Sequence, residues 1–263
     1  MEILKLYIVV LYKTSIKDCL TIQSFIQCKL FENKNNRFIF WDNSPNPNIY
    51  DNQNYCKQLG YNILYESHPE NTSLALVYNN CISRNLDCDI VCIFDQDSQI
   101  NQIDYEKYLD DVLNKNPKIP VFLPQIYSNG KLYSPGKFWV FKGWHYKQLS
   151  EGIHKDKLYT AIMSGAIVRI DAIKKYKLVF NEELQLYGID TCFFIDLRQY
   201  DCSFYLLKTE LIHDLSEKTL NKNEYKKRIN IYLNCNRIIA RDNGFYLFII
   251  FLYKIFLRIF KKI

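Results

Sequence analysis

The chain has 263 residues, 48% of them hydrophobic and 24% charged, which is the composition of a folded globular protein and excludes a disordered scaffold. Its net charge of +6 is concentrated at the C-terminus, because residues 222–263 carry ten Lys or Arg side chains against two acidic ones and residues 1–221 are left at −2. A nucleic-acid-binding domain would normally spread basic side chains over its folded face, so we expect no nucleic-acid partner.

Nine cysteines stand singly along the chain. Their odd number and the absence of any CxxC pair exclude a zinc-finger or thioredoxin-like pattern and argue against a disulfide framework. We therefore expect reduced, mostly buried thiols. The first residues, MEILKLYIVVLYK, predict a buried strand rather than a signal peptide. Both observations favour a cytoplasmic protein.

The first part of the chain alternates between apolar runs and helical patterns. Strands are predicted at residues 4–11, 37–41, 62–65 and 90–94, and helices within 16–26, after Ser15 as N-cap, and 73–86. This alternation predicts an α/β fold with a mixed, mostly parallel sheet flanked by helices. Ligands of such sheets bind beyond the carboxyl ends of the strands, where Asp42 and Asp95 stand.

The later part of the chain is less regular. A helix over residues 105–113 and a strand over 121–126 are followed by an irregular segment at 133–146. An apolar stretch at 161–170 then precedes a helix that begins near Asp190. No GxGxxG or GxxxxGKS/T pattern occurs, so neither a dinucleotide-binding Rossmann domain nor a P-loop is supported.

The strongest chemical signal is Asp95-Gln96-Asp97, which directly follows the apolar run 90–94. Mg²⁺ and Mn²⁺ prefer oxygen ligands and often share one or two protein carboxylates with substrate phosphates. A solvated acidic turn has the same three-residue pattern, so this motif alone does not distinguish a metal site from such a turn.

The order of motifs resembles that of family 2 glycosyltransferases with a GT-A fold, and the sequence DQDS at 95–98 is similar to their rhamnosyltransferase-like branch. Residues 8–12 resemble the first strand and nucleotide-binding loop, and residues 41–44 (WDNS) the second strand end, whose Asp contacts the base. Residues 71–79 are similar to the family segment N-x-G-x-A-x-A-x-N, with Ser73 where Gly is usual. The resemblance, which covers about residues 3–215, implies a donor site formed by Tyr12, Asp42, Asn71, Asn79 and Asp95.

The resemblance continues on the acceptor side. Residues 163–169 resemble the small-residue acceptor segment of the family, and Asp190 stands where its members carry a general base, although Ile189 and Cys192 replace common family neighbours. The resemblance implies that Asp95 and Asp97 hold a divalent metal (Mg²⁺ or Mn²⁺) and that His213 can complete its ligand shell. The alternatives are a helix N-cap for Asp190 and an ordinary hydrogen-bonded side chain for His213.

The implied activity is inverting transfer of a hexose from a dTDP- or UDP-sugar, with rhamnose favoured, to a lipid-linked oligosaccharide or surface polysaccharide precursor. One alternative is a sugar-phosphate nucleotidyltransferase, which would normally show a Gly-rich loop where this chain has residues 12–15 (YKTS). Another is a membrane-bound scaffold subunit with a decayed site, suggested by Ser73 and the changed neighbours of Asp190.

The C-terminal residues have a different pattern. Residues 245–253 are uncharged and apolar or aromatic, and Lys254, Arg258, Lys261 and Lys262 then recur at helical spacing on one face. Such an amphipathic cationic helix lies in the interface of an anionic membrane and is too short to span it. We therefore expect a catalytic domain at 1–221 and a membrane-associating tail at 222–263, peripheral at the inner face of the plasma membrane; packing of this helix on its own domain is the alternative.

Overall fold

The computed structural model describes residues 2–60, 62–128, 130–140, 142–184, 186–212, 235–240 and 244–260. His213 and the basic residues between 222 and 228 lie outside the described residues, so the predicted metal role of His213 is not tested. The structural statements below concern the described residues.

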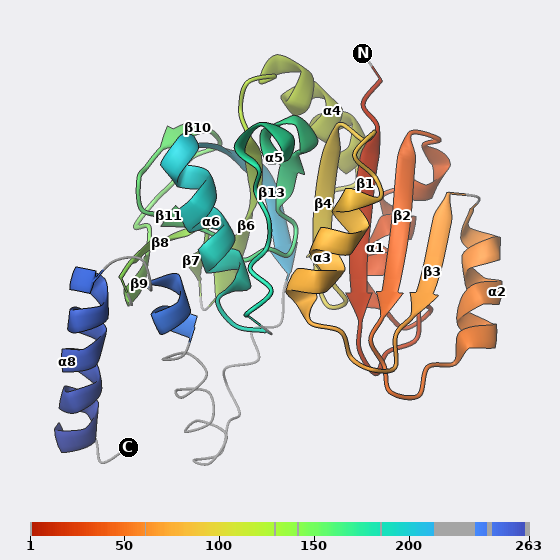
Figure 1. The fold of residues 1–263 in the computed structure, drawn as a ribbon. Helices are drawn as coiled ribbons and strands as arrows, with labels where there is room; N and C mark the ends of the chain where they lie inside the picture. The colour runs from red at the N-terminus through yellow and green to blue at the C-terminus, as the bar shows by residue number, and fades with distance from the viewer. Residues whose placement is uncertain are drawn as a thin grey trace.

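The first half of the chain forms a parallel sheet with the strand order β3-β2-β1-β4. These strands are β1 (Lys5–Leu11), β2 (Asn36–Asp42), β3 (Ile63–Ser67) and β4 (Ile90–Asp95). They are connected by α1 (Leu20–Gln27), the short helix η1 (Leu30–Glu32), α2 (Ile49–Leu59) and α3 (Leu74–Ser83). Every residue of β1 is buried, because the sheet is covered on both faces (Figure 1).

The second half extends this sheet on the β4 side. It contains β5 (Gln99–Ile100), α4 (Tyr105–Lys115), β6 (Val121–Ser128), β7 (Lys131–Ser134), β10 (Gly152–Lys155), β12 (Ile167–Arg169), α5 (Ile170–Tyr176), α6 (Ile189–Tyr200) and β13 (Ser203–Ile212). β12 is antiparallel to both β4 and β6, whereas β13 is parallel to β6. A separate small sheet consists of β8 (Gly136–Trp139), β9 (Lys142–His145) and β11 (Tyr159–Thr160). The predicted mixed α/β fold is confirmed.

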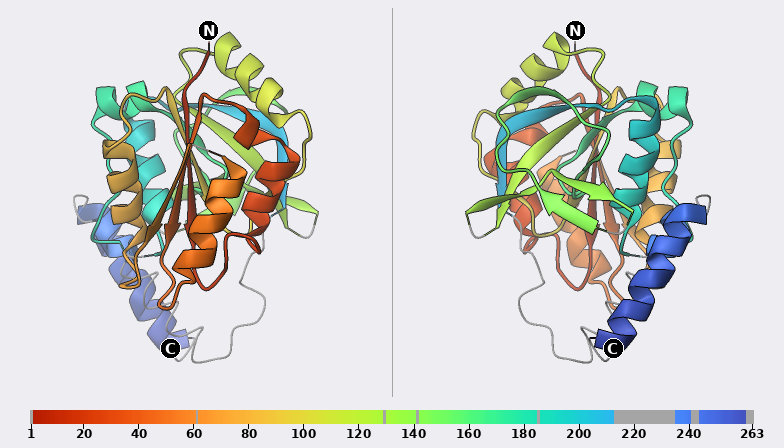
Figure 2. Two further views of the ribbon diagram at one scale, coloured as in Figure 1. Left: turned by 90° about the vertical axis from the view of Figure 1, so that its right-hand side faces the viewer. Right: turned by 90° about the vertical axis from the view of Figure 1, so that its left-hand side faces the viewer.

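The core consists of two apolar layers, one on each face of the sheet. On one face the side chains of α3, α5 and α6 pack together, and on the other those of α1 and α4 (Figure 2). Eight of the nine cysteines are buried, and no disulfide joins any of them, all nine being within the described residues. The prediction of reduced, mostly buried cysteines is therefore confirmed. A free cysteine is among the most frequently buried residue types and packs in a core as a small apolar side chain.

Three local predictions were wrong. The first helix begins at Leu20 with Cys19 as N-cap, and Ser15 instead accepts a hydrogen bond from the N–H of Asp18 (3.1 Å) in the preceding turn. α2 was not predicted; Asn48 caps it by accepting from the N–H of Asp51 (3.3 Å). The segment 133–146, expected to be irregular, contains strand residues of β7, β8 and β9.

The described C-terminal residues pack against the rest of the chain. Cys235, Asn236 and Ala240 are buried, and α8 (Gly244–Phe260) places Ile250 against Val140 and Ala240. On the other side of α8 the side chain of Phe248 is exposed. None of the helices in the described part of the chain has the length and hydropathy needed to cross a membrane.

Candidate functional site

The turn at residues 95–98 is fixed to the first turn of α1. Thr21 is the connecting residue: its hydroxyl donates to the carbonyl of Asp95 and accepts from the N–H of Ser98 (2.9 Å), and its own N–H donates to the carbonyl of Gln96 (3.2 Å). The side-chain oxygen of Gln96 accepts from the N–H of Tyr12 (2.7 Å), just beyond β1. The two acidic residues of the DxD motif therefore stand on a backbone that is held on several sides.

The loop 163–166 packs directly on the end of β4. The hydroxyl oxygen of Ser164 accepts from the N–H of Asp95 (2.8 Å) and shares a hydrogen bond with the hydroxyl of Ser98 (2.6 Å); both serines are buried. Gly165 has φ of +78°, and a Cβ there would lie 2.2 Å from Cδ1 of Leu211. Only glycine fits at this position.

Asp190 is the second residue of α6, and the N-cap of this helix is Gly188. The alternative that Asp190 caps the helix is therefore wrong. Its Oδ1 accepts from the N–H of Thr191 (3.1 Å), and the backbone N–H of Met163 is near enough to the carboxylate to lower its pKa. Burial raises the pKa of Asp190, and these N–H donors oppose that effect. Part of its surface remains accessible to solvent.

The loop 163–166 brings the DxD turn and Asp190 together. The backbone N–H of Met163 lies near the carboxylate of Asp190 and lowers its pKa, and the next residue, Ser164, binds the backbone of Asp95. The buried ring of Tyr78 on α3 is close to both carboxylates: burial raises its pKa well above the usual value, and the negative charges of Asp95 and Asp190 add to this. Residues from distant parts of the sequence thus form one cluster at the carboxyl end of β4.

Tyr12, Asp42 and Asn71, which are predicted to contact the donor, all follow the carboxyl ends of parallel strands. Tyr12 is 42% exposed and Asn71 is exposed with φ of +56°. Asp42 is fully buried. One of its oxygens accepts from the N–H of Ser44 (2.9 Å) and the other from the hydroxyl of Tyr65 (2.7 Å). The exposed side chains can meet a ligand directly, whereas Asp42 is engaged within the protein.

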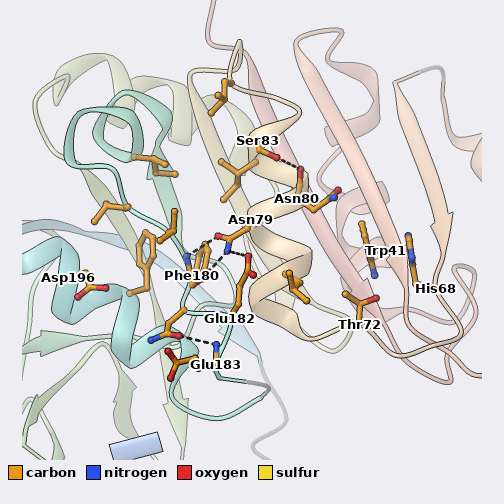
Figure 3. A pocket seen from close by; sticks show the side chains of 18 of the residues that line it. Trp41, His68, Thr72, Asn79, Asn80, Ser83, Phe180, Glu182, Glu183 and Asp196 are labelled. Carbon is orange, nitrogen blue, oxygen red and sulfur yellow. Dashed lines mark hydrogen bonds between the residues drawn. The ribbon is translucent and has the colours of Figure 1, made fainter. Parts of the chain in front are cut away.

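Asn79 on α3 binds the segment that precedes α6 (Figure 3). Its side-chain oxygen accepts from the N–H of Phe180 (2.8 Å), and its NH₂ group donates to the carbonyl of Phe180 (2.9 Å) and to Glu182 (3.0 Å). Ser73, which stands where the family usually has Gly, is the N-cap of α3 and accepts from the N–H of Leu76 (3.4 Å). Both polar residues thus have structural partners in this fold.

A groove of about 1080 Å³ runs along the outer side of α3 (Figure 3). At one end the rings of Trp41 and His68 stack with centroids 3.7 Å apart, and at the other end lies Asp196 (Figure 3). Burial raises the pKa of Asp196. Asp95, Asp97 and Asp190 do not line this groove, so it is separate from the carboxylate cluster.

The donor set of the DxD turn fits a metal that is shared with a substrate. Within the described residues no group of three or more His, Cys, Asp or Glu side chains could hold a metal ion. Asp95 and Asp97 provide two carboxylates, and divalent cations bound to diphosphates commonly take the remaining oxygens from the phosphates and water. A metal held by protein ligands alone is not what these residues would form.

No protein-family model matches the sequence, and no curated protein matches it. Among solved structures, GalNAc-T7 with UDP, GalNAc and Mn²⁺ aligns with a TM-score of 0.65 at 11% identity, over 87% of this chain and 47% of that chain. Residues 1–349 of S. aureus TarS in complex with UDP-GlcNAc align with a TM-score of 0.59 at 14% identity, over 90% of this chain and 65% of that chain. The chain thus spans less than two thirds of either structure, and at these identities the similarity shows the fold, which is that of GT-A glycosyltransferases.

Proposed function

We propose that the chain is an inverting glycosyltransferase that moves a hexose from a nucleotide sugar to an acceptor hydroxyl, with Asp190 as general base. The observation that supports this most directly is the loop 163–166, in which the backbone N–H of Met163 lies near the carboxylate of Asp190 and Ser164 binds the DxD turn. This arrangement supports a base that would act beside the donor diphosphate, because the DxD turn is the proposed metal-diphosphate site.

The proposed reaction needs two carboxylate functions in separate places. The oxygen of the acceptor hydroxyl attacks the anomeric carbon while Asp190 accepts the proton of that hydroxyl. The bond from the anomeric carbon to the diphosphate breaks on the opposite face. The pKa of Asp190 is raised by burial, which makes its carboxylate a stronger base. Asp95 and Asp97, with His213 as a further candidate, would hold Mg²⁺ or Mn²⁺, which offsets the negative charge of the diphosphate.

The donor assignment rests on the residues beyond the parallel strands and on the DQDS motif. We propose that Tyr12 and Asn71 contact the nucleotide, which is UDP or dTDP, and that the buried Asp42 supports this site through the backbone of Ser44. The similarity of DQDS to the rhamnosyltransferase-like branch of family 2 favours rhamnose. For Asn79 we propose an indirect role, because its amide already binds Phe180 and Glu182.

A thermal-shift panel tests the donor site. The panel contains UDP, dTDP and their sugars, each with and without Mn²⁺. Ligands of one nucleotide family should raise the melting temperature of the protein, and they should do so only when the metal is present. Asp95→Asn with Asp97→Asn should abolish that shift, and Asp111→Asn, a change of an exposed residue on α4, should preserve it. If folded protein responds to none of these ligands, the proposed function fails and a decayed scaffold becomes the better explanation.

We further propose that α8 holds the protein at the inner face of the plasma membrane, where a lipid-linked oligosaccharide acceptor is located. One side of α8 packs on Val140 and Ala240, but Phe245, Phe248 and Phe251 are 64%, 57% and 58% exposed. In Figure 1 the arrowheads of β1, β2 and β3 point to the lower end of the molecule, and α8 extends beyond the same end. Exposed aromatic side chains on a helix suit the interface of a membrane.

Sedimentation with vesicles tests the membrane proposal. The protein should pellet with phosphatidylglycerol vesicles, and the triple change of Phe245, Phe248 and Phe251 to Ser should leave it in the supernatant. The matched control replaces three exposed apolar residues elsewhere, Tyr50, Ile103 and Val179, by Ser. Equal pelleting of both triple variants would rule out α8 as the membrane contact.

A further inference from the structure

The turn before α6 is in close contact with residues 235–240. The thiol of Cys235 donates to the carbonyl of Tyr187 (2.9 Å). Gly188 has φ of +81°, and a Cβ on it would lie 3.1 Å from Cβ of Cys235 and 3.5 Å from Cδ1 of Ile239. The segment 235–240 therefore lies directly on the backbone of this turn, at a distance that the lack of a side chain at residue 188 makes possible.

This contact belongs to the core of the molecule. Cys235 is 6% exposed, and its side chain is part of the same apolar cluster as Ile189 and Phe193 of α6. Ile238 and Ile239 pack against that cluster as well. The segment thus covers the start of the helix that carries Asp190.

The first turn of α6 needs such external support. Its N-cap, Gly188, has no side chain that could form a capping hydrogen bond, so the position of this turn depends on the residues that pack on it. On one side of Asp190 lies the backbone N–H of Met163, which lowers the pKa of its carboxyl group. On the other side the turn that leads to it is held by Cys235 and Ile239.

We infer that residues 235–240 position Asp190 for proton abstraction, with Cys235 as the main positioning residue. The inference rests on the proposed function, in which Asp190 is the base. Cys235 contacts neither donor nor acceptor in this proposal; it acts by fixing the backbone of residues 187 and 188. A displacement of about 1 Å in a catalytic group can reduce a rate by about 100-fold, so loss of this contact should act on turnover more than on donor binding.

The test compares Cys235→Ala with Cys88→Ala in the full-length protein. Cys88 is 4% exposed and belongs to the same apolar cluster, but it lies before β4, at the opposite end of that strand from Asp95. Hydrogen exchange of the amides in 187–193 should become faster in Cys235→Ala and stay unchanged in Cys88→Ala. Cys235→Ser, which keeps a donor for the carbonyl of Tyr187, should restore part of the protection.

The second readout is hydrolysis of the nucleotide sugar that stabilises the protein most in the thermal-shift panel. Cys235→Ala should lower kcat by about 10-fold or more and leave the donor KM within about twofold, since only the base is displaced. Gly188→Ala should act in the same direction. Unchanged exchange and unchanged kcat in Cys235→Ala would overturn the inference. If no nucleotide sugar stabilises the wild-type protein, the proposed function fails, and the exchange comparison still decides whether this segment holds the turn.

Discussion

Replacing Ser164 by Ala should weaken both the fold and the donor site. The hydroxyl of Ser164, a residue 1% exposed, binds the N–H of Asp95 at 2.8 Å and the hydroxyl of Ser98 at 2.6 Å. Alanine removes one partner from each of these two groups, and a buried polar group that loses its partner costs about 1–3 kcal/mol. We therefore expect the free energy of unfolding to fall by about 2–3 kcal/mol, from two such losses at the low end of that range.

Urea unfolding measures this loss, and Ser24→Ala provides the matched control. Ser24 is also buried, but its hydroxyl makes a single hydrogen bond, to the carbonyl of Thr21 (2.8 Å) within α1, so its loss should cost about 1 kcal/mol. Ser164→Ala should also weaken metal-dependent nucleotide binding, because the backbone of the DxD turn loses a support, whereas Ser24→Ala should not. If Ser164→Ala is no less stable than Ser24→Ala, the loop 163–166 does not hold this turn.

Three further changes have distinct expected results. Asn79→Ala should lower the free energy of unfolding by about 2 kcal/mol, because the backbone of Phe180 loses two hydrogen-bond partners. Nucleotide affinity, measured by calorimetry, should not change. A loss of affinity without a loss of stability would mean that Asn79 binds the donor. Asp190→Asn should lower kcat about 10²–10⁴-fold without lowering stability at pH 7, because burial disfavours the charged carboxylate. In the wild type, kcat should fall as the pH drops through the raised pKa of Asp190, and a flat profile would speak against this base. Gly165→Ala should cost more than about 1 kcal/mol in urea unfolding, since φ is +78° and a Cβ would collide with Leu211; stability equal to wild type would show that the loop relaxes.

The strands that could be predicted from the sequence are those buried on both faces. β1, β2 and β4 appear as unbroken apolar runs, because helices cover the sheet on both sides and few positions face water. Their carboxyl ends were also predictable, since Asp42 and Asp95 end two of these runs. The sequence therefore predicts the half of the fold on which the DxD motif stands.

Elements with little apolar surface could not be predicted in the same way. α2 buries only Asn52 and Cys56, so its sequence has no apolar stripe of helical period. The short strands β8 and β9 pair with each other in a small separate sheet, and all four residues of β9 are exposed. Their formation depends on pairing partners rather than on a buried face, which single-sequence patterns do not report.

The contacts that assemble the candidate site are also non-local. Ser164 reaches the N–H of Asp95 because β12 pairs with β4 in a register that sets Ile167 opposite Cys92. A register is a tertiary property, so Thr21 gave no signal, and the resemblance of residues 163–169 to an acceptor segment did not indicate that Ser164 binds the backbone of Asp95. Cys235 was likewise one of nine single cysteines, and only the packing of residues 235–240 distinguishes it from the others.

The two supports of Asp190 differ in what else they hold. The loop 163–166 also binds the backbone of Asp95, so a change there reaches the donor side and the base together. The segment 235–240 contacts the turn before α6 and packs on the start of α6, so a change there should reach the base first. Variants of Ser164 and Cys235 can therefore separate donor binding from proton transfer, because each removes a support of a different set of groups.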